Sequence, residues 1–164
     1  MKVSIKVKDS IDNELMEFFS HVYQPNILIS PTFVKSFTPN CLFLISYFKS
    51  HPIMYWPLIL TETHKESYVP EFIYYLGPCY TKYFYSLLEH KKFHLRNIVI
   101  ESALPTILEK LSVVNFQSNI SETDIRPFIW AASKNNLIIN YQAKYTAIVD
   151  IIGNNKFVDK FRQL

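Results

Sequence analysis

Two long runs of apolar, aromatic and β-branched residues lie close together near the middle of the chain. They are CLFLISYF (residues 41–48) and IMYWPLILTE (residues 53–62), and the short segment KSHP separates them. Such residues favour strands, and a connection this short joins two strands as an antiparallel hairpin. Pro57 has no amide hydrogen for a sheet ladder, so we expect it at a sheet edge or at a bulge.

Periodic patterns on either side of the hairpin predict further elements. Residues 3–8 alternate like a strand. Residues 11–22 then have helical spacing, with Asp9 or Ser10 as the N-cap. Ser30 and Pro31 predict the start of a short helix, because serine caps helices and proline suits their first turn.

The C-terminal half shows the same alternation of strand and helix patterns. Pro105 is expected to kink or break its helix, and Asp124 to cap the one that follows. The expected elements are strands at 71–76 and 113–117, helices at 96–111 and 125–132, a long strand or hairpin at 137–151, and a short polar helix at the end. We therefore expect residues 1–164 to form a single mixed α/β (α+β) domain.

Composition limits the classes of protein to which the chain can belong. Hydrophobic residues make up 49% of its 164 residues and charged residues only 19%, which predicts a real core and some apolar surface for a partner. The uncharged stretch 18–34 contains prolines and polar residues, so we expect no membrane span. The N-terminus lacks the apolar segment of a secretory signal, so we expect a cytoplasmic protein.

Glycine is scarce. Average usage would give about eleven glycines, but the chain has only Gly77 and Gly153. Loops that cradle phosphates need clustered glycines, because a Cβ atom would keep backbone N–H groups away from the anion. The sequence therefore excludes a glycine-loop site for a nucleotide or for coenzyme A.

Three polar features have both a chemical and a structural interpretation. Cys79 follows Gly-Pro and is either a nucleophile or a small apolar filler. His90 and His94 have the spacing of metal ligands on a helix, but neighbouring lysines and Arg96 oppose a cation, and we expect no metal. The same run, residues 90–96, is either a weak nucleic-acid site or a solvated basic face; a net charge of +3 does not favour nucleic acid.

The segment YYLGPCYTKYF (residues 74–84) places five aromatic rings around Gly77. Tyrosine combines an apolar ring with a polar hydroxyl, which suits a pocket or an interface as well as a core. The sequence leaves these alternatives open.

Several of these stretches together resemble the first lobe of the FemAB-like branch of the GNAT acyltransferases. LFLISYFKSHPIMYWPLILTE looks like the family's opening hairpin with its LPL phrase, and FIYYLGPCYTKYF is similar to its aromatic-proline loop. Residues 113–151 resemble a strand, a helix of the QNFxPxxxxWLPFYWxGF type and a strand ending in YTYxIDL. The positions that match in this last piece are Gln117, Asn119, Pro127, Phe128, Trp130, Tyr145, Thr146 and Asp150.

This resemblance covers about residues 40–164 and implies a GNAT-like, mostly antiparallel sheet flanked by helices. It also implies a lobe that binds the acceptor amine of an amino acid, amino sugar or cell-wall precursor. We expect no second lobe and no cofactor in this chain, and an acyl-CoA or aminoacyl donor only where a second lobe is supplied. The expected partners are a catalytic GNAT lobe or a second copy of the chain, and a small-molecule amine acceptor. The residues expected to line the acceptor cleft are Tyr80, Lys82, Tyr83, Gln117, Asn119 and Trp130.

Two alternatives stay open beside this interpretation. The first is a non-catalytic binding or assembly module on the same fold, which low charge and abundant tyrosine favour. The second is weak nucleic-acid binding through residues 90–96. No catalytic residue can be assigned from the sequence.

Overall fold

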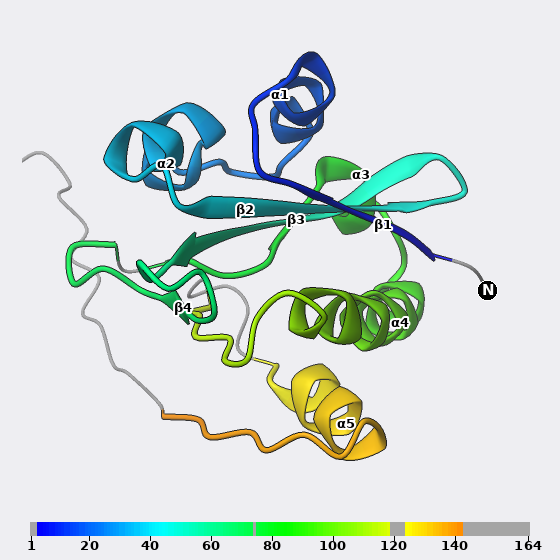
Figure 1. Ribbon diagram of the computed structural model, residues 1–164. Helices are drawn as coiled ribbons and strands as arrows, with labels where there is room; N and C mark the ends of the chain where they lie inside the picture. Colours follow the sequence, from blue (N-terminus) through cyan, green and yellow to red (C-terminus); the bar gives the residue numbers. More distant parts are fainter. Residues whose placement is uncertain (1–2, 74, 119–123, 143–164) are drawn as a thin grey trace, which may run out of the picture.

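The computed structural model describes residues 3–73, 75–118 and 124–142. These residues form an antiparallel sheet of five strands with helices on both sides (Figure 1). The strands are β1 (Val3–Lys8), β2 (Cys41–Phe48), β3 (His51–Leu60), β4 (Ser67–Tyr68) and β5 (Cys79–Tyr80). The helices are α1 (Asn13–Ser20), the 3-10 helix η1 (Ile27–Ile29), α2 (Pro31–Phe37), α3 (Lys82–Tyr85), α4 (Glu89–Leu108) and α5 (Arg126–Lys134). The predicted mixed α/β domain with an antiparallel sheet between helices is confirmed.

The predicted hairpin is also confirmed. Strands β2 and β3 pair antiparallel, with Leu44 opposite Trp56. Lys49 and Ser50 form the turn, and their φ angles of 48° and 67° are both positive. A two-residue turn with this backbone matches the right-handed twist of the strands that it joins. Here the turn forms without the glycine that usually favours it.

Strand β3 is the centre of the sheet. It pairs with β2 along one side and with the short strands β4 and β5 along the other. Every residue from 53 to 60 is buried. Met54 and Trp56 face α4, whereas Tyr55 and Ile59 face α1 and α2. Burial on both faces explains why this part of the sequence is continuously apolar and does not alternate.

Pro57 lies in this central strand, not at the edge or bulge that the sequence predicted. The Leu60 N–H donates to Asn40 O on the β2 side, and the Thr61 N–H donates to Glu66 O on the other side. Because alternate residues point their amides in opposite directions, the Pro57 nitrogen faces the second side. On that side β4 pairs with residues 59–60 and β5 with residues 54–55. Pro57 lies between these two pairings and is opposite neither strand. The missing amide hydrogen therefore breaks no ladder bond.

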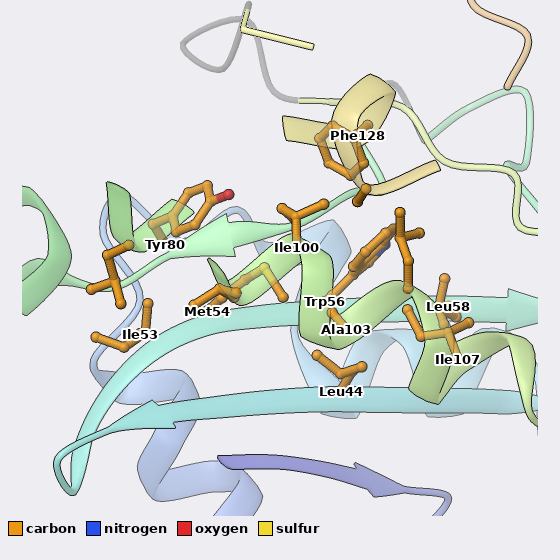
Figure 2. Packing of buried hydrophobic residues seen from close by; sticks show 14 of the residues in the cluster. Leu44, Ile53, Met54, Trp56, Leu58, Tyr80, Ile100, Ala103, Ile107 and Phe128 are labelled. Carbon is orange, nitrogen blue, oxygen red and sulfur yellow. The ribbon is translucent and has the colours of Figure 1, made fainter. Parts of the chain in front are cut away.

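Two separate apolar clusters hold the helices against the sheet. On one face α4 covers the sheet and α5 lies beyond it; Figure 2 shows Trp56 and Phe128 packed between these layers. On the other face, α1 and α2 cover the strands through Leu15, Phe18 and Val34. The sheet is thus the middle layer of three.

The third predicted strand, residues 71–76, does not form in its described part; Tyr74 lies outside the described residues. Pro70 O accepts the Ile73 N–H at 3.0 Å in a turn, and among the described residues of the segment Leu76 alone forms a bridge. Two prolines, Pro70 and Pro78, bracket the segment and remove ladder donors, which explains the lost strand. Residues 113–117 are likewise no regular strand; Val113 and Gln117 form isolated bridges.

The helix predicted over 96–111 exists, but its bounds differ. Helix α4 begins at Glu89 and continues through Pro105 to Leu108, so the proline does not break it. A proline removes only one helical bond, and this one lies in the last turn, where few bonds remain to be lost.

The predicted helix caps are partly correct. Ser30 caps α2 as expected, with its Oγ accepting from the Phe33 N–H. Asp12 caps α1, in place of Asp9 or Ser10. Asp124 Oδ1 accepts the Arg126 N–H at 3.1 Å, although the N-cap of α5 is Ile125.

The predicted strand or hairpin at 137–151 does not form in its described part. Residues 137–142 have no regular secondary structure. Residues 143–151 and the expected closing helix lie outside the described residues. No helix in the part of the chain that the structure describes is long and apolar enough to span a membrane.

Gly77 is needed where two segments approach closely. The Gln117 N–H donates to Leu76 O at 3.1 Å. A Cβ atom at Gly77 would lie 2.9 Å from Gln117 O and 3.3 Å from Ser118 Cα. The first contact is shorter than real Cβ contacts and the second is tighter than most, and both partners are backbone atoms that cannot rotate away.

We therefore expect Gly77→Ala to lower the free energy of unfolding by about 1–3 kcal/mol, measured by urea denaturation. Ser133→Ala, on the exposed surface of α5, is the control and should change it by less than about 0.5 kcal/mol. Equal stability of the two variants would show that this close approach does not exist in solution.

Candidate functional site

The residues that the sequence predicted for a cleft lie in two places. Tyr80 and Trp130 belong to a network of rings and charges at α4 and α5. Lys82 and Tyr83 lie where the hairpin turn meets the end of α1. Gln117 is half-buried and bonds through its backbone to Leu76. Asn119 lies outside the described residues.

Tyr80 packs in the core, with only 3% of its surface exposed. Its ring stacks on Phe84 at a centroid distance of 4.2 Å. The Arg96 guanidinium lies 5.2 Å from the Tyr80 ring and 5.4 Å from the Phe84 ring. Figure 2 shows Tyr80 beside the residues of this core. Tyr80 therefore supports Arg96 and does not form an open wall.

A chain of contacts links Arg96 to the exposed rings of α4 and α5. Arg96 Nη1 lies 4.0 Å from Asp124 Oδ2, and Arg126 donates two hydrogen bonds to the same carboxylate, at 2.8 and 2.9 Å. The hydrogen bonds from Arg126 lower the pKa of Asp124. Arg126 also covers the Phe93 ring, which meets Trp130 edge-on. Phe93 and Trp130 are 37% and 49% exposed, so this network ends at an aromatic surface.

The second of these two places, where the hairpin turn meets the end of α1, is held together by Thr81, the N-cap of α3. Its Oγ1 donates to Pro52 O at 2.6 Å. The next residue, Lys82, donates its backbone N–H to His21 O at 2.8 Å and its Nζ to Ser20 O at 3.2 Å. Tyr83 stacks on His51 at 4.1 Å. The aromatic loop is thus bonded both to the hairpin and to the end of α1.

A groove of about 550 Å³ opens beside this junction. It lies between α1, β1 and the turn of the β2–β3 hairpin. Its lining includes hydroxyl groups, charged groups and two aromatic rings, contributed by Ser4, Lys6, Glu14, Glu17, Phe18, His21, Tyr47, Ser50 and Pro52. A groove with this lining suits a small polar ligand.

Glu14 is the fixed charge in the wall of the groove. Lys6 Nζ donates to its carboxylate at 2.6 Å, Lys8 Nζ lies 2.7 Å away, and the Tyr47 hydroxyl donates at 3.1 Å. The bond from Lys6, followed by that from Lys8, lowers the pKa of Glu14 to about 2. Burial, and then the bond to Glu14, raises the pKa of Tyr47 to about 12. Glu14 therefore has its charge compensated within the wall.

Glu17 and His21 differ from Glu14 because, among the described residues, their side chains have no such partners. Glu17 lies on α1 and His21 is its C-cap, four residues later, and the exposed side chains of both line the groove. Within the described ranges, no lysine, arginine or histidine forms an ion pair with the Glu17 carboxylate. Sequence reasoning missed both residues. The helical spacing of Glu14, Glu17 and His21 indicates that their side chains share one side of the helix. It does not indicate which strand lies opposite that side.

The other polar candidates show no assembled site. The Cys79 Sγ lies 3.5 Å from Gly77 O, and burial raises the pKa of the Cys41 thiol. His90 and His94 are exposed on α4. Among residues 3–73, 75–118 and 124–142, no three His, Cys, Asp or Glu side chains come together in a way that could hold a metal ion.

Comparison of the chain with known protein families, with curated proteins and with solved structures finds no match. The assignment of a function therefore depends on the groove, the aromatic loop and the chemistry of their side chains.

The ion pairs of Glu14 predict how stability depends on pH. The folded pKa of about 2 lies below the ordinary value of 4.5, so the contribution of Glu14 is present above pH 4.5 and is lost as pH falls toward 2. Because solvent screens this partly exposed group, we expect Glu14→Gln to cost at most about 1 kcal/mol at pH 7.

The difference from the unsubstituted chain should shrink between pH 4.5 and pH 2, measured by urea denaturation. Glu109→Gln, at an exposed position after α4, serves as the control and should show no such trend. A difference that is independent of pH would contradict the charge compensation of Glu14.

Proposed function

We propose that this chain is an acceptor-binding lobe of a FemAB-like, GNAT-type acyltransferase and that it holds a small primary amine for acylation. The observation that carries the proposal is the junction between the aromatic loop and the groove. Lys82 Nζ donates to the carbonyl of Ser20, the last residue of α1, and the Lys82 N–H donates to the carbonyl of His21, which lines the groove. The loop that resembles the family's aromatic-proline loop thus borders a groove with polar walls.

The chemistry of such a lobe is to hold the amine and to assist the loss of its proton. A primary amine at neutral pH is an ammonium ion, which a carboxylate attracts. It attacks a thioester or aminoacyl ester only after it loses a proton to a base. Glu17 on α1 and His21 at its C-cap offer a carboxylate and an imidazole to the groove. The thiol or alcohol of the donor would be the leaving group.

The acyl donor in this proposal is bound by another, catalytic lobe. A coenzyme A site of the glycine-loop type requires clustered glycines. The chain has two glycines, and Gly77 packs tightly against Gln117 and Ser118. A cytoplasmic location is part of the proposal and rests on the sequence alone.

A non-catalytic assembly module is the second candidate. The observation in its favour is the pair of exposed rings, Phe93 and Trp130, at the junction of α4 and α5. Aromatic residues are enriched in the centres of protein interfaces. If neither amines nor coenzyme A bind, this candidate becomes the preferred one.

Nucleic-acid binding through residues 90–96 gains less support. Lys92 donates to Glu89 at 2.8 Å and lies over the Tyr85 ring. Arg96 is directed toward Tyr80, Phe84 and Asp124. Two of the cations in this run are therefore engaged within the protein, which leaves little charge for phosphates.

Calorimetric titration of the whole chain tests the proposal. We expect a class of small primary amines to bind with a Kd on the order of 1 mM, a value typical of a few polar contacts. Their N-acetylated forms should bind less tightly, because acetylation removes the charge. Coenzyme A should show no binding at micromolar concentration; micromolar affinity would contradict the claim that the donor site lies elsewhere.

A further inference from the structure

We propose that the groove between α1 and β1 binds a hydroxylated primary amine of the amino-sugar class, with its ammonium group on Glu17. This inference rests on the proposed function and narrows its acceptor to one chemical class. Three features of the groove carry it: the charge of its lining, the position of the Glu17 carboxylate and the hydroxyl groups.

The first feature is the charge of the lining. Lys6 contributes +1, and Glu14 and Glu17 contribute −1 each, so the lining carries −1 with His21 neutral. Lys8 and Asp12, just outside it, form an ion pair and cancel. The protein as a whole carries +3. An acidic groove in a basic protein attracts a cationic ligand to this place in particular.

The second feature is the position of this negative charge. Glu14 accepts bonds from Lys6 and Tyr47 and lies within ion-pair distance of Lys8. The pKa of Tyr47 is raised mainly by burial and by the bond to Glu14, and the charge of Glu17 adds a small further rise. Among the described residues Glu17 has no cationic partner of its own. Glu17 is therefore the carboxylate that is available to a ligand's ammonium group.

The third feature is the hydroxyl content of the groove. Ser4 and Ser50 line it, and no described residue forms a hydrogen bond with either hydroxyl. The Tyr47 hydroxyl donates to Glu14 and still has a lone pair to accept a bond. The rings of Phe18 and Tyr47 meet edge-on at 5.1 Å and offer apolar contact. Hydroxyl groups beside aromatic rings match the alternating O–H and C–H groups of a sugar.

The groove discriminates against an amino acid for the same reasons. An α-carboxylate would need a cation, but Lys6 Nζ is bonded to Glu14 at 2.6 Å. A ligand carboxylate in the groove would also lie near Glu14 and Glu17 and be repelled by both. The hydroxyl groups of a sugar carry no charge and avoid this cost.

The test is an NMR titration of the full chain with glucosamine, followed through backbone amide shifts. We expect a Kd on the order of 1 mM, with the largest shifts at residues that line the groove, such as Ser4, Lys6, Glu17 and His21. N-acetylglucosamine and glucose lack the ammonium group and should bind at least about tenfold more weakly, because a charged hydrogen bond is lost. Lysine serves as the amino-acid probe and should also be weaker.

Variants test the role of Glu17. Glu17→Gln keeps the shape of the side chain and should raise the Kd of glucosamine about tenfold. Glu109→Gln removes a carboxylate after the end of α4 and should leave it unchanged. Ser4→Ala should weaken binding two- to threefold, as expected for loss of a neutral hydrogen bond. Amide spectra of each variant show directly whether it is folded.

Each contrary result has a distinct meaning. The role assigned to Glu17 is overturned if N-acetylglucosamine binds as tightly as glucosamine. It is also overturned if the Glu17→Gln variant binds glucosamine as tightly as the unsubstituted chain does. Lysine binding in the groove as tightly as glucosamine overturns the amino-sugar class but leaves the proposed function intact. Glucosamine shifts confined to Phe93 and Trp130, or no shifts at all, overturn the groove as the site. The proposed function itself is contradicted by micromolar binding of coenzyme A, or by the failure of every small primary amine to bind.

Discussion

The burial of β3 on both faces is the constraint on which the rest of this structure depends. Trp56 on one face needs α4 and α5, and Tyr55 on the other needs α1 and α2. Each face would expose a large apolar surface if helices did not cover it. The burial of that surface is the main source of stability. The one polar group of Tyr55 is satisfied inside, since its hydroxyl donates to Ile29 O at 2.8 Å. The burial of β3 therefore depends on the helices of both layers.

The position of the groove follows from the same hairpin. The register of β2 and β3 shifts between Ser46 and Tyr47, and the Ser46 hydroxyl accepts the Met54 N–H at 3.1 Å. Ile53 is left outside the ladder with β2, and its carbonyl accepts the Thr81 N–H at 2.9 Å. A β-bulge bends the strand that contains it and changes the direction of the residues that follow. Here it brings the aromatic loop to the hairpin turn, beside the end of α1. Without this shift the loop and the groove would not adjoin.

Local signals in the sequence predicted the hairpin, β1 and the cap of α2, because each depends on neighbouring residues. The strand predicted at residues 71–76 rested on the strand propensity of aromatic residues. That propensity competes with two flanking prolines and with a turn at residues 71–72. The groove could not be predicted, since Glu17 becomes significant only when α1 packs beside β1. Tyr80 was expected to line the acceptor cleft, but it is buried against Arg96. The burial of an aromatic loop residue depends on distant helices that no local pattern reveals.

A sheet covered on both faces thus borders an acidic, hydroxyl-lined groove, and we propose that this groove, and not the aromatic surface at Phe93 and Trp130, binds the small amine. A crystal structure of the chain with bound glucosamine would locate the ligand. We expect its ammonium nitrogen about 3 Å from a Glu17 carboxylate oxygen, the distance of a charged hydrogen bond. Glucosamine bound at Phe93 and Trp130, with an empty groove, would contradict this proposal.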